Sequence, residues 1–583
     1  MFIQGIKRRG HTYYAVYHGK RLANKVVRET KLYIGKLEDL DEPKRIEIEN
    51  KLKKLQDTTL IQKFHNLLYS TGYTFPSPVS TWNVKDVYSY GPELALHKIC
   101  EEIDLINVIN RHTNKGGGPD LGMVVEAMII ARNCDPCSYY QLPDWYSRSS
   151  LPFFLSFPPS EITYQVSLNA LDYLQPETTV AMQVDLYENI KHVYGYECER
   201  LDIDLTSTYF EGKECILAMF GYSRDHRSDR PQIVIAFVVD QKGVLVTHRV
   251  WPGNQTDAKS LEQVDTCLRE DFALKKAPRV VDRGIATWKN IDYMDEKKER
   301  YLVALRAGVK NTGLLEEIET PKDEWVEMEE NSVAASVIKG RRKYVVAWTA
   351  SVAETNKKER MTKVTRAENK LNKLLESVRK GKVESKKQRD EKSGWILKNF
   401  AVKKFLEVED VREDEVSFTI TRKKALLEAE KYDGYQVFVT TETDMSEKDV
   451  IDSYKIRDEI EKAIQTLKSA LGLHPQYVRT KEHVLGNIFV CATAYQLRSI
   501  LRLKLRECGF DMSVEEAMKT LERLKAVHIA VGNEGNVEVY RKLSGLNGET
   551  RTLVEVFNMS ENGKFPEVIS NRPWDKITQS AVP

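Results

Sequence analysis

The segment LDIDLTSTYF (residues 201–210) decides the fold, because it is the clearest β-strand pattern in the chain and carries two acids. Side chains alternate between the two faces of a strand, so apolar and polar positions separate here. One face receives Leu201, Ile203, Leu205 and Tyr209, and the other receives Asp202, Asp204, Thr206 and Thr208. Two carboxylates therefore project from one face, although a half-exposed strand with a polar outer side would give the same pattern.

Strand-like segments continue outward from this point. They are ECILAMFGYS (214–223), QIVIAFVVD (232–240) and VLVTHRVWP (244–252). A helix is predicted over about 257–273, and RVVD (279–282), a short helix and YLVALR (301–306) follow. Consecutive strands, a helix and then a strand-helix-strand unit predict an α/β fold with a mixed sheet covered by helices.

A third acid comes from PRVVDRG (278–284), where a short apolar strand ends in Asp282. Open α/β sheets bind ligands at the carboxyl ends of their strands, which is where this side chain is expected. An aspartate in a turn or at a helix N-cap would fit the same segment.

The segment DVIDSYKIRDEIEKAIQTLKSALG (449–472) predicts one amphipathic helix, from about Ser446 to about Ala470. At 100° per residue its apolar stripe is Ile456, Ile460, Ile464, Leu467 and Leu471. Beside that stripe, within about 60° of one another, lie Tyr454, Arg457, Glu461 and Lys468. The simplest alternative is an ordinary helix with an Arg457–Glu461 pair, which stabilises by a few tenths of a kcal/mol.

Composition shifts divide the rest of the chain. Residues 1–40 predict a basic β-unit that binds DNA, since the first 36 hold nine Lys/Arg, among them Lys7, Arg8 and Arg9, against Glu29 alone. The predicted parts are then a helical region (41–199), the first part of the core (200–306), an insertion with a long charged segment (307–445), the second part of the core (446–510) and a C-terminal helical region that could serve dimerisation (511–583).

Global composition excludes several classes of protein. The 583 residues are 41% apolar and 30% charged, with a formal net charge of +2, so any affinity for nucleic acid must come from local basic patches. No run of 18 apolar residues occurs and the N-terminus lacks an apolar signal core, so we expect a cytoplasmic protein with no membrane partner. Eight cysteines are too few for a disulfide scaffold.

A second set of residues has the chemistry of a zinc site. Cys134 and Cys137 form a lone CxxC, and His97 with Cys100 could complete a set of N and S ligands. The apolar neighbours Leu94, Leu96, Ile99 and Ile103 favour an ordinary packed helix instead.

With these motifs in place, the chain resembles the DDE transposases of bacterial and archaeal insertion sequences. The spacing Y-x2-R-x3-E-x6-K, carried by Tyr454, Arg457, Glu461 and Lys468, is similar to the signature helix of the branch with a large insertion before the last acid. Asp204 stands two residues before a Thr and Asp282 precedes Arg-Gly, as in that family. Also similar are GYSRDHRSDRPQIVIAFVV (221–239), WPGNQTD (251–257) and DGYQVFVTT (433–441).

The resemblance implies an RNase H-like catalytic domain in which Asp204, Asp282 and Glu461 are catalytic and hold two Mg²⁺ ions, or Mn²⁺ in their place. Hard cations of this kind prefer oxygen ligands. Tyr454, Arg457 and Lys468 would contact DNA or orient the glutamate. The sequence departs from the family at Ile464 and Gln465, where an aromatic residue and an Arg are frequent, and spacing alone leaves Asp202 beside Asp204 as the first acid.

The function implied is that of a transposase, which binds the terminal inverted repeats of its element, cleaves at the ends and joins 3′-hydroxyls to target DNA. The partners would be double-stranded DNA and at least one further copy of the chain, in the cytoplasm at the nucleoid. The helical region 41–199, with the basic unit before it, would be the part that binds the element ends. Two alternatives stay open: an RNase H-like nuclease without strand transfer, and an inactive DNA-binding derivative.

Overall fold

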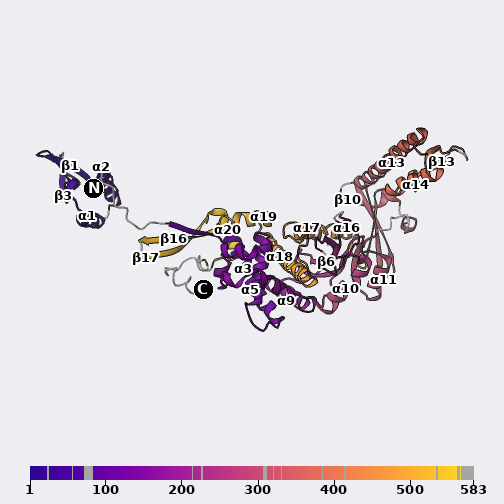
Figure 1. Cartoon of the computed structure of the whole chain (residues 1–583), viewed down its shortest axis with the longest axis horizontal. Helices are drawn as coiled ribbons and strands as arrows, with labels where there is room; N and C mark the ends of the chain where they lie inside the picture. Colours follow the sequence, from indigo (N-terminus) through magenta and orange to yellow (C-terminus); the bar gives the residue numbers. More distant parts are fainter. Residues whose placement is uncertain are drawn as a thin grey trace. The chain divides into compact units, whose positions relative to one another are not determined.

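A computed structural model of the chain describes residues 1–22, 25–55, 57–70, 83–212, 214–224, 227–305, 312–318, 321–329, 331–383, 385–412, 415–533, 536–560 and 565. The chain forms two compact units, a smaller one built mainly from Met1–Val87 and a larger one built mainly from Tyr88–Ala526 (Figure 1). The last stretch of the predicted C-terminal region, residues 566–583, lies outside the described residues.

The smaller unit begins with an antiparallel sheet on which two helices pack. The strands are β1 (Phe2–Arg8), β2 (His11–Leu22) and β3 (Lys25–Gly35), and the helices are α1 (Glu42–Lys54) and α2 (Thr58–Ser70). The core between them includes Val16, Leu52 and Phe64, each fully buried. The β1–β2 turn places Arg9 and Gly10 at positive φ, and Lys7, Arg8 and Arg9 are exposed at that turn.

A second three-stranded sheet belongs mainly to the smaller unit and joins distant parts of the sequence. Its order is β17 (Asn536–Ser544), β16 (Lys525–Asn533) and β4 (Asn83–Ser89). The region from residue 511 therefore contains a β-hairpin as well as the helices α19 (Val514–Leu521) and α20 (Gly548–Val556).

The larger unit opens with a helical region. Its helices are α3 (Gly91–Glu102), α4 (Leu105–Arg111), α5 (Leu121–Cys134), α6 (Leu142–Arg148), α7 (Leu151–Phe154), α8 (Tyr164–Asp172) and α9 (Pro176–Tyr194). The central helix, α5, is buried along nearly its whole length because α3, α4, α8 and α18 (Lys481–Glu507) surround it.

A nine-stranded mixed sheet follows, in the order β10-β11-β12-β15-β9-β8-β5-β6-β7 among the described residues. Its core strands are β5 (Leu201–Tyr209), β6 (Gln232–Asp240), β7 (Leu245–Pro252), β8 (Arg279–Val281) and β9 (Tyr301–Ala304). The first three are antiparallel, whereas β8 and β9 run parallel to β5. The helices α10 (Asp257–Glu270) and α11 (Trp288–Glu296) connect them.

This arrangement confirms the predicted fold class, an α/β RNase H-like mixed sheet with flanking helices. One predicted strand is wrong: residues 214–223 make only an isolated bridge between Met219 and Gln232. They loop over the sheet with Ile216, Phe220 and Tyr222 exposed to solvent, because the neighbouring position beside β5 is taken by β6.

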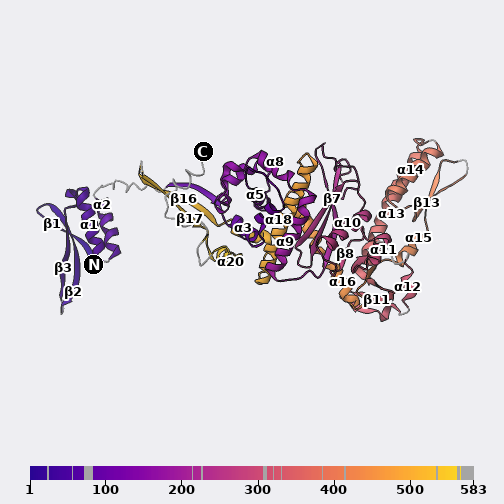
Figure 2. The same ribbon diagram turned by 90° about the horizontal axis from the view of Figure 1, so that it is seen from below.

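Residues 312–440 extend the same sheet and add a helical projection. The added strands are β10 (Val326–Met328), β11 (Ser332–Lys339), β12 (Arg342–Thr349) and β15 (Tyr435–Thr440), with the short helix α12 (Leu314–Glu317) before them. The projection consists of α13 (Ala350–Arg379), α14 (Lys386–Asn399), β13 (Leu406–Asp410), β14 (Phe418–Arg422) and α15 (Ala425–Glu430) (Figure 2). It has its own small core around Leu371, Phe405 and Phe418.

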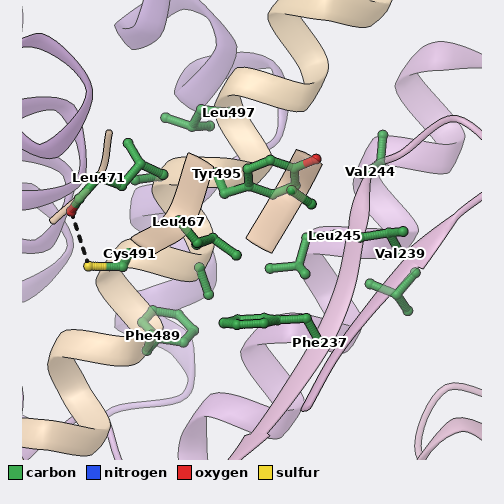
Figure 3. Packing of buried hydrophobic residues seen from close by; sticks show 14 of the residues in the cluster. Phe237, Val239, Val244, Leu245, Leu467, Leu471, Phe489, Cys491, Tyr495 and Leu497 are labelled. Atoms are coloured by element: carbon green, nitrogen blue, oxygen red, sulfur yellow. Dashed lines mark hydrogen bonds between the residues drawn. The ribbon is translucent and has the colours of Figure 1, made fainter. Parts of the chain in front are cut away.

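Two helices cover one face of the sheet. Helix α16 (Glu447–Lys455) packs Val450 and Ile451 onto β9, β12 and β15, and α17 (Asp458–Lys468) packs onto β5 and β6. Figure 3 shows Leu467 of α17 facing Phe237 and Leu245 of the sheet, with Phe489 and Tyr495 of α18 beside it. Leu471 lies farther from the sheet, next to Cys491.

Helix α18 is long and apolar enough to span a membrane by length and composition. All of its most apolar stretch is buried against other elements, so it packs here as a core helix.

Candidate active site

The sheet register brings Asp204 and Asp282 side by side. Strands β5 and β8 are parallel, and Ile203 lies opposite Val281 in the last paired position. Asp204 and Asp282 are the next residues of the two strands, so their side chains leave neighbouring strands at the same level. Backbone hydrogen bonds between two strands thus fix the spacing of this acid pair.

Arg457 lies between the two acids. Its Nη2 is 3.7 Å from Oδ1 of Asp204, and its Nη1 is 3.4 Å from Oδ1 of Asp282. The guanidinium is almost fully buried, at 5% exposure, and its Nε has no hydrogen-bond partner among the described residues. The two carboxylates are therefore held together by one buried cation, and the sequence-based alternative of an Arg457–Glu461 pair is not what the side chain forms.

The environment of Asp204 disfavours its charge. Burial raises its pKa to about 6, and the neighbouring carboxylate of Asp282 adds to the shift, while the charges of Arg457 and Arg224 oppose it. A carboxyl that loses water and gains a like charge behaves in this way. A strongly perturbed acid beside a second acid is a common mark of a functional site.

The two candidates for the first acid differ in their surroundings. Asp202 is 2% exposed, and its Oδ1 lies 2.7 Å from Nη2 of Arg200. The side chain of Asp204 is 21% exposed and lies beside Asp282. Asp202 thus has the position of a buried, paired charge, whereas Asp204 can reach solvent.

The predicted single helix from Ser446 to Ala470 is wrong. Helix α16 ends at Lys455, α17 begins at Asp458, and Ile456–Arg457 form a turn between them. The amides of Arg457, Glu459 and Ile460 donate to carbonyls three residues back, so the backbone winds more tightly here. The start of α16 is as predicted, because Ser446 caps this helix by accepting a hydrogen bond from the amide of Asp449.

The break gives the four residues of the motif different positions. Tyr454 lies in the last turn of α16, with its ring 5.2 Å from that of Phe438 and its hydroxyl 3.5 Å from Oδ1 of Asp282. Glu461 is exposed on α17, one turn beyond Arg457, and Lys468 is the last residue of that helix. Lys7, Arg8 and Arg9 belong to the smaller unit.

Helix α17 is held from its opposite side. Oε2 of Glu459 pairs with Nη1 of Arg502 at 2.8 Å and its Oε1 pairs with Nη2 of Arg506 at 3.2 Å, both on α18. Glu461 is two residues further on, which is about 200° around the helix. It therefore points away from α18.

The carboxylates at this site determine whether it fits a divalent cation. Within the described residues, no group of three or more His, Cys, Asp or Glu is arranged to hold a metal ion. Asp204 and Asp282 alone supply adjacent carboxylates, and Mg²⁺ is commonly bound by one or two carboxylates together with waters and substrate phosphates. The aspartate pair fits such an ion, while the carboxylate of Glu461 is not part of the set in this conformation.

The zinc alternative finds no geometric basis in the described residues. Both ring nitrogens of His97 have carboxylate partners: Nδ1 lies 2.7 Å from Oε1 of Glu126, and Nε2 lies 3.5 Å from Oε1 of Glu101. It acts as a buried ion-pair partner within the helical region.

Arg224 was not singled out from the sequence. Its amide donates to Oγ of Ser207 on β5, and its charge lowers the pKa of Asp204. The segment GYSRDHRSDR that contains it was noted for its resemblance, but nothing in its spacing indicates that this arginine lies beside the first acid.

Comparison with known proteins places residues 199–497 in a family described as the transposase DDE domain. No curated protein matches the chain by sequence. Two solved structures are similar to it: a piggyBac transposase synaptic complex with hairpin DNA (10% identity, 74% of this chain and 80% of that chain, TM-score 0.35) and a Mos1 transposase paired-end complex with the left transposon end (12% identity, 33% and 60%, TM-score 0.14). At these TM-scores no correspondence of site residues is drawn.

Proposed function

This chain belongs to the transposase DDE domain family, and from that premise we propose that it is the transposase of a bacterial or archaeal insertion sequence, of the branch with the Y-x2-R-x3-E-x6-K motif. It binds the terminal inverted repeats of its element, cleaves DNA at the element ends and transfers the 3′-hydroxyl ends to target DNA. A 3′-hydroxyl attacks a phosphodiester and another 3′-oxygen leaves, without a covalent link to the protein.

The observation that carries the proposal is the pairing of Asp204 and Asp282 by the register of β5 and β8. Two carboxylates in one place, on the face covered by α16 and α17, are what metal-dependent phosphoryl transfer requires of a protein. We assign catalytic and ligand roles to Asp204, Asp282 and Glu461, with the glutamate joining the pair when DNA is bound.

Asp204 and Asp282 would hold Mg²⁺ or Mn²⁺, and two such ions when bound stabilise charge on the attacking and leaving oxygens. Arg457 keeps the two carboxylates together in the free protein. Its planar guanidinium also suits a phosphate. We propose that it turns from the aspartates to the DNA backbone once the acids engage a cation.

DNA binding is assigned to two regions. Tyr454, Arg457 and Lys468 lie beside the acids or on α17 and are proposed to contact DNA near the scissile phosphate. Lys7, Arg8 and Arg9 form an exposed basic turn in the smaller unit and are proposed to contact phosphates of the element end. Contacts of this kind make binding strongly dependent on salt.

Two element ends must be held together, so we propose at least a dimer on DNA. The protein is proposed to act in the cytoplasm at the nucleoid.

The test is a strand-transfer assay with full-length protein, Mg²⁺ and DNA that carries the sequences flanking the coding region. Joined products that depend on an inverted-repeat end support the proposal. Cleavage without joining would indicate a nuclease, and specific binding without cleavage would indicate an inactive derivative. The simplest supporting observation is a pair of short inverted repeats with a target duplication around the coding region.

A further inference from the structure

A cavity of about 630 Å³ lies in the larger unit, away from the acid pair. Its walls are the loop after α17 (472–480), the segment around the end of α5 (132–140) and α8. Sites for small molecules span roughly 300–1,000 Å³, so there is room for one nucleotide.

Aromatic rings line this cavity and remain open to solvent. Tyr140 is 77% exposed, Tyr477 is 75% exposed and Tyr164 is 46% exposed. The rings of Tyr140 and Tyr164 meet edge to face, with centroids 6.0 Å apart. Exposed tyrosine rings in a hollow offer flat surfaces on which a base can stack.

The cavity also holds positive charge. Arg132 is partly buried, with its guanidinium 5.2 Å from the centre of the Tyr139 ring, and no carboxylate pairs with it among the described residues. Arg479 is exposed at the rim, and the acidic lining residue is Glu214. A guanidinium that faces a cavity without a carboxylate partner favours an anionic group such as a phosphate.

The floor of the cavity is fixed by hydrogen bonds. Oδ1 of Asn487 accepts from Nη2 of Arg132 at 3.1 Å and from the hydroxyl of Tyr139 at 2.6 Å. Its Nδ2 donates to Oε1 of Gln476 at 3.0 Å. The arginine is thereby held in place before any ligand binds, which lowers the cost of ordering it.

Strand β5 connects this cavity to the acids. Thr208 lies on the same strand face as Asp204, four residues or about 13 Å along. Its hydroxyl is 3.2 Å from Nδ1 of His474, a cavity residue, and Phe210 forms a β-bridge with Gln476. A DNA strand rises about 3.4 Å per nucleotide, so Thr208 is about four nucleotides from Asp204 and the cavity, which lies beyond Thr208, is more than about four nucleotides from the acid pair.

We infer that this cavity binds a single unpaired nucleotide of the DNA strand, more than about four nucleotides from the phosphodiester that is cut. The base stacks on Tyr477 or Tyr140, and the neighbouring phosphate is bound by Arg132 and Arg479. Moving a base out of the duplex costs the free energy of its pairing and stacking. Stacking of the base on the tyrosine rings offsets this cost. This inference rests on the proposed function and adds a second DNA site to it.

The first test measures binding of full-length protein to a short oligothymidylate by fluorescence anisotropy. Tyr477→Ala should weaken binding about tenfold, because loss of one stacking ring typically costs this much. Tyr477→Phe keeps the ring and should bind as the unchanged protein does. Equal affinity of the Ala variant, or displacement of the oligonucleotide by inorganic phosphate at similar concentration, would overturn the inference.

The second test places 5-iodouracil at successive positions from the cleavage point of the end DNA and maps photocrosslinks. Crosslinks to the peptides of Tyr140 or Tyr477 should appear only beyond about the fourth position, and crosslinks to these peptides from the first four positions alone, or none to them at any position, contradict the inference. The Asp204→Asn variant separates the two proposals. If it loses cleavage and keeps the crosslinks, both stand; if the unchanged protein binds oligothymidylate through Tyr477 but never cleaves DNA, only the proposed function fails; if it binds no DNA, both fail.

Discussion

Strands and helices present the acids of the candidate site in different ways. Asp204 and Asp282 leave paired strands at one level, so their spacing is set by main-chain hydrogen bonds. Glu461 is carried by α17, which joins the sheet through side-chain packing and follows a turn at Ile456–Arg457. The strand-built half of the candidate site, Asp204 and Asp282, is therefore formed in the free protein. The helix-built half, Glu461, is exposed and would meet the two aspartates only in the proposed DNA-bound state.

The largest effect is expected from the strand-built half. Asp204→Asn and Asp282→Asn should each lower DNA cleavage by on the order of 10³-fold, because an amide replaces the charge that would hold a cation. Both side chains keep their shape and remain next to Arg457, so the fold should persist. Cleavage of end DNA with Mg²⁺ is the measurement, with circular dichroism to verify folding.

Asp202→Asn is the matched control, since it changes an acid two residues away on the same face. It should lower the free energy of unfolding by about 1–3 kcal/mol by weakening the pair with Arg200, and retain cleavage by the folded protein. If Asp202→Asn abolished cleavage while Asp204→Asn remained active, the first acid would have to be reassigned.

The cation between the acids gives the next largest effect, and it can be measured without an activity assay. Arg457→Met should lower the free energy of unfolding by about 3 kcal/mol, because two neighbouring carboxylates lose their buried partner. Added Mg²⁺ should restore part of that loss if the aspartate pair holds a divalent cation. Thermal unfolding with Mg²⁺ and with a chelator gives both quantities.

Arg360→Met is the control for that experiment. Arg360 is similarly buried, at 9% exposure, and its Nη1 lies 2.6 Å from Oδ1 of Asp433 in the insertion. Its loss should be as destabilising but insensitive to Mg²⁺. Equal recovery of both variants would show that the ion acts on the protein in general and not on Asp204 and Asp282.

The helix-built half is tested by Glu461→Gln. Cleavage should fall by at least about a hundredfold, whereas the free energy of unfolding should change by less than about 0.5 kcal/mol because the side chain is exposed. Glu459→Gln should keep cleavage but lower the free energy of unfolding, because it weakens the ion pairs of this residue with Arg502 and Arg506. Unchanged cleavage by the Glu461 variant would refute its assignment as the third acid.

The sequence predicted the strand-built half better than the helix-built half, for a physical reason. Alternation along LDIDLTSTYF put Asp202 and Asp204 on one face of a strand, and RVVD put Asp282 directly after the next parallel strand. Strand pairing is regular enough for acids placed in this way to meet, although the choice of Asp204 over Asp202 came from the family resemblance. The angular argument for Tyr454, Arg457, Glu461 and Lys468 assumed a straight helix. The helix breaks at Arg457 because α16 packs on β9, β12 and β15 whereas α17 packs on β5 and β6. No local sequence pattern predicts this break.

Other features depended on contacts across the chain. The approach of Arg457 to both aspartates joins residues more than 170 positions apart, and the strands of residues 312–440 join the core sheet through β15 pairing with β9. The cavity at Tyr477 likewise combines α5, α8 and the loop after α17. None of these leaves a signal within a short window of sequence.

The effect that is smallest near neutral pH concerns the packing that supports the strand-built half. Burial lowers the pKa of His248 on β7 to about 3, and its ring lies between Phe237 and Phe489, at centroid distances of 6.4 and 6.3 Å. The unfolded chain takes up a proton near pH 6.5 but the folded chain does not, so this residue costs about 1.4 kcal/mol per pH unit as the pH falls from about 6.5 to 3. Urea unfolding at several pH values should show a shallower acid loss for His248→Met than for the unchanged protein. If the free energy of unfolding fell with pH equally in both proteins, the imidazole would be protonated within the fold and water would have to enter beside β7. The sheet would then be less rigid than the contrast between the strand-built acids and Glu461 on α17 assumes.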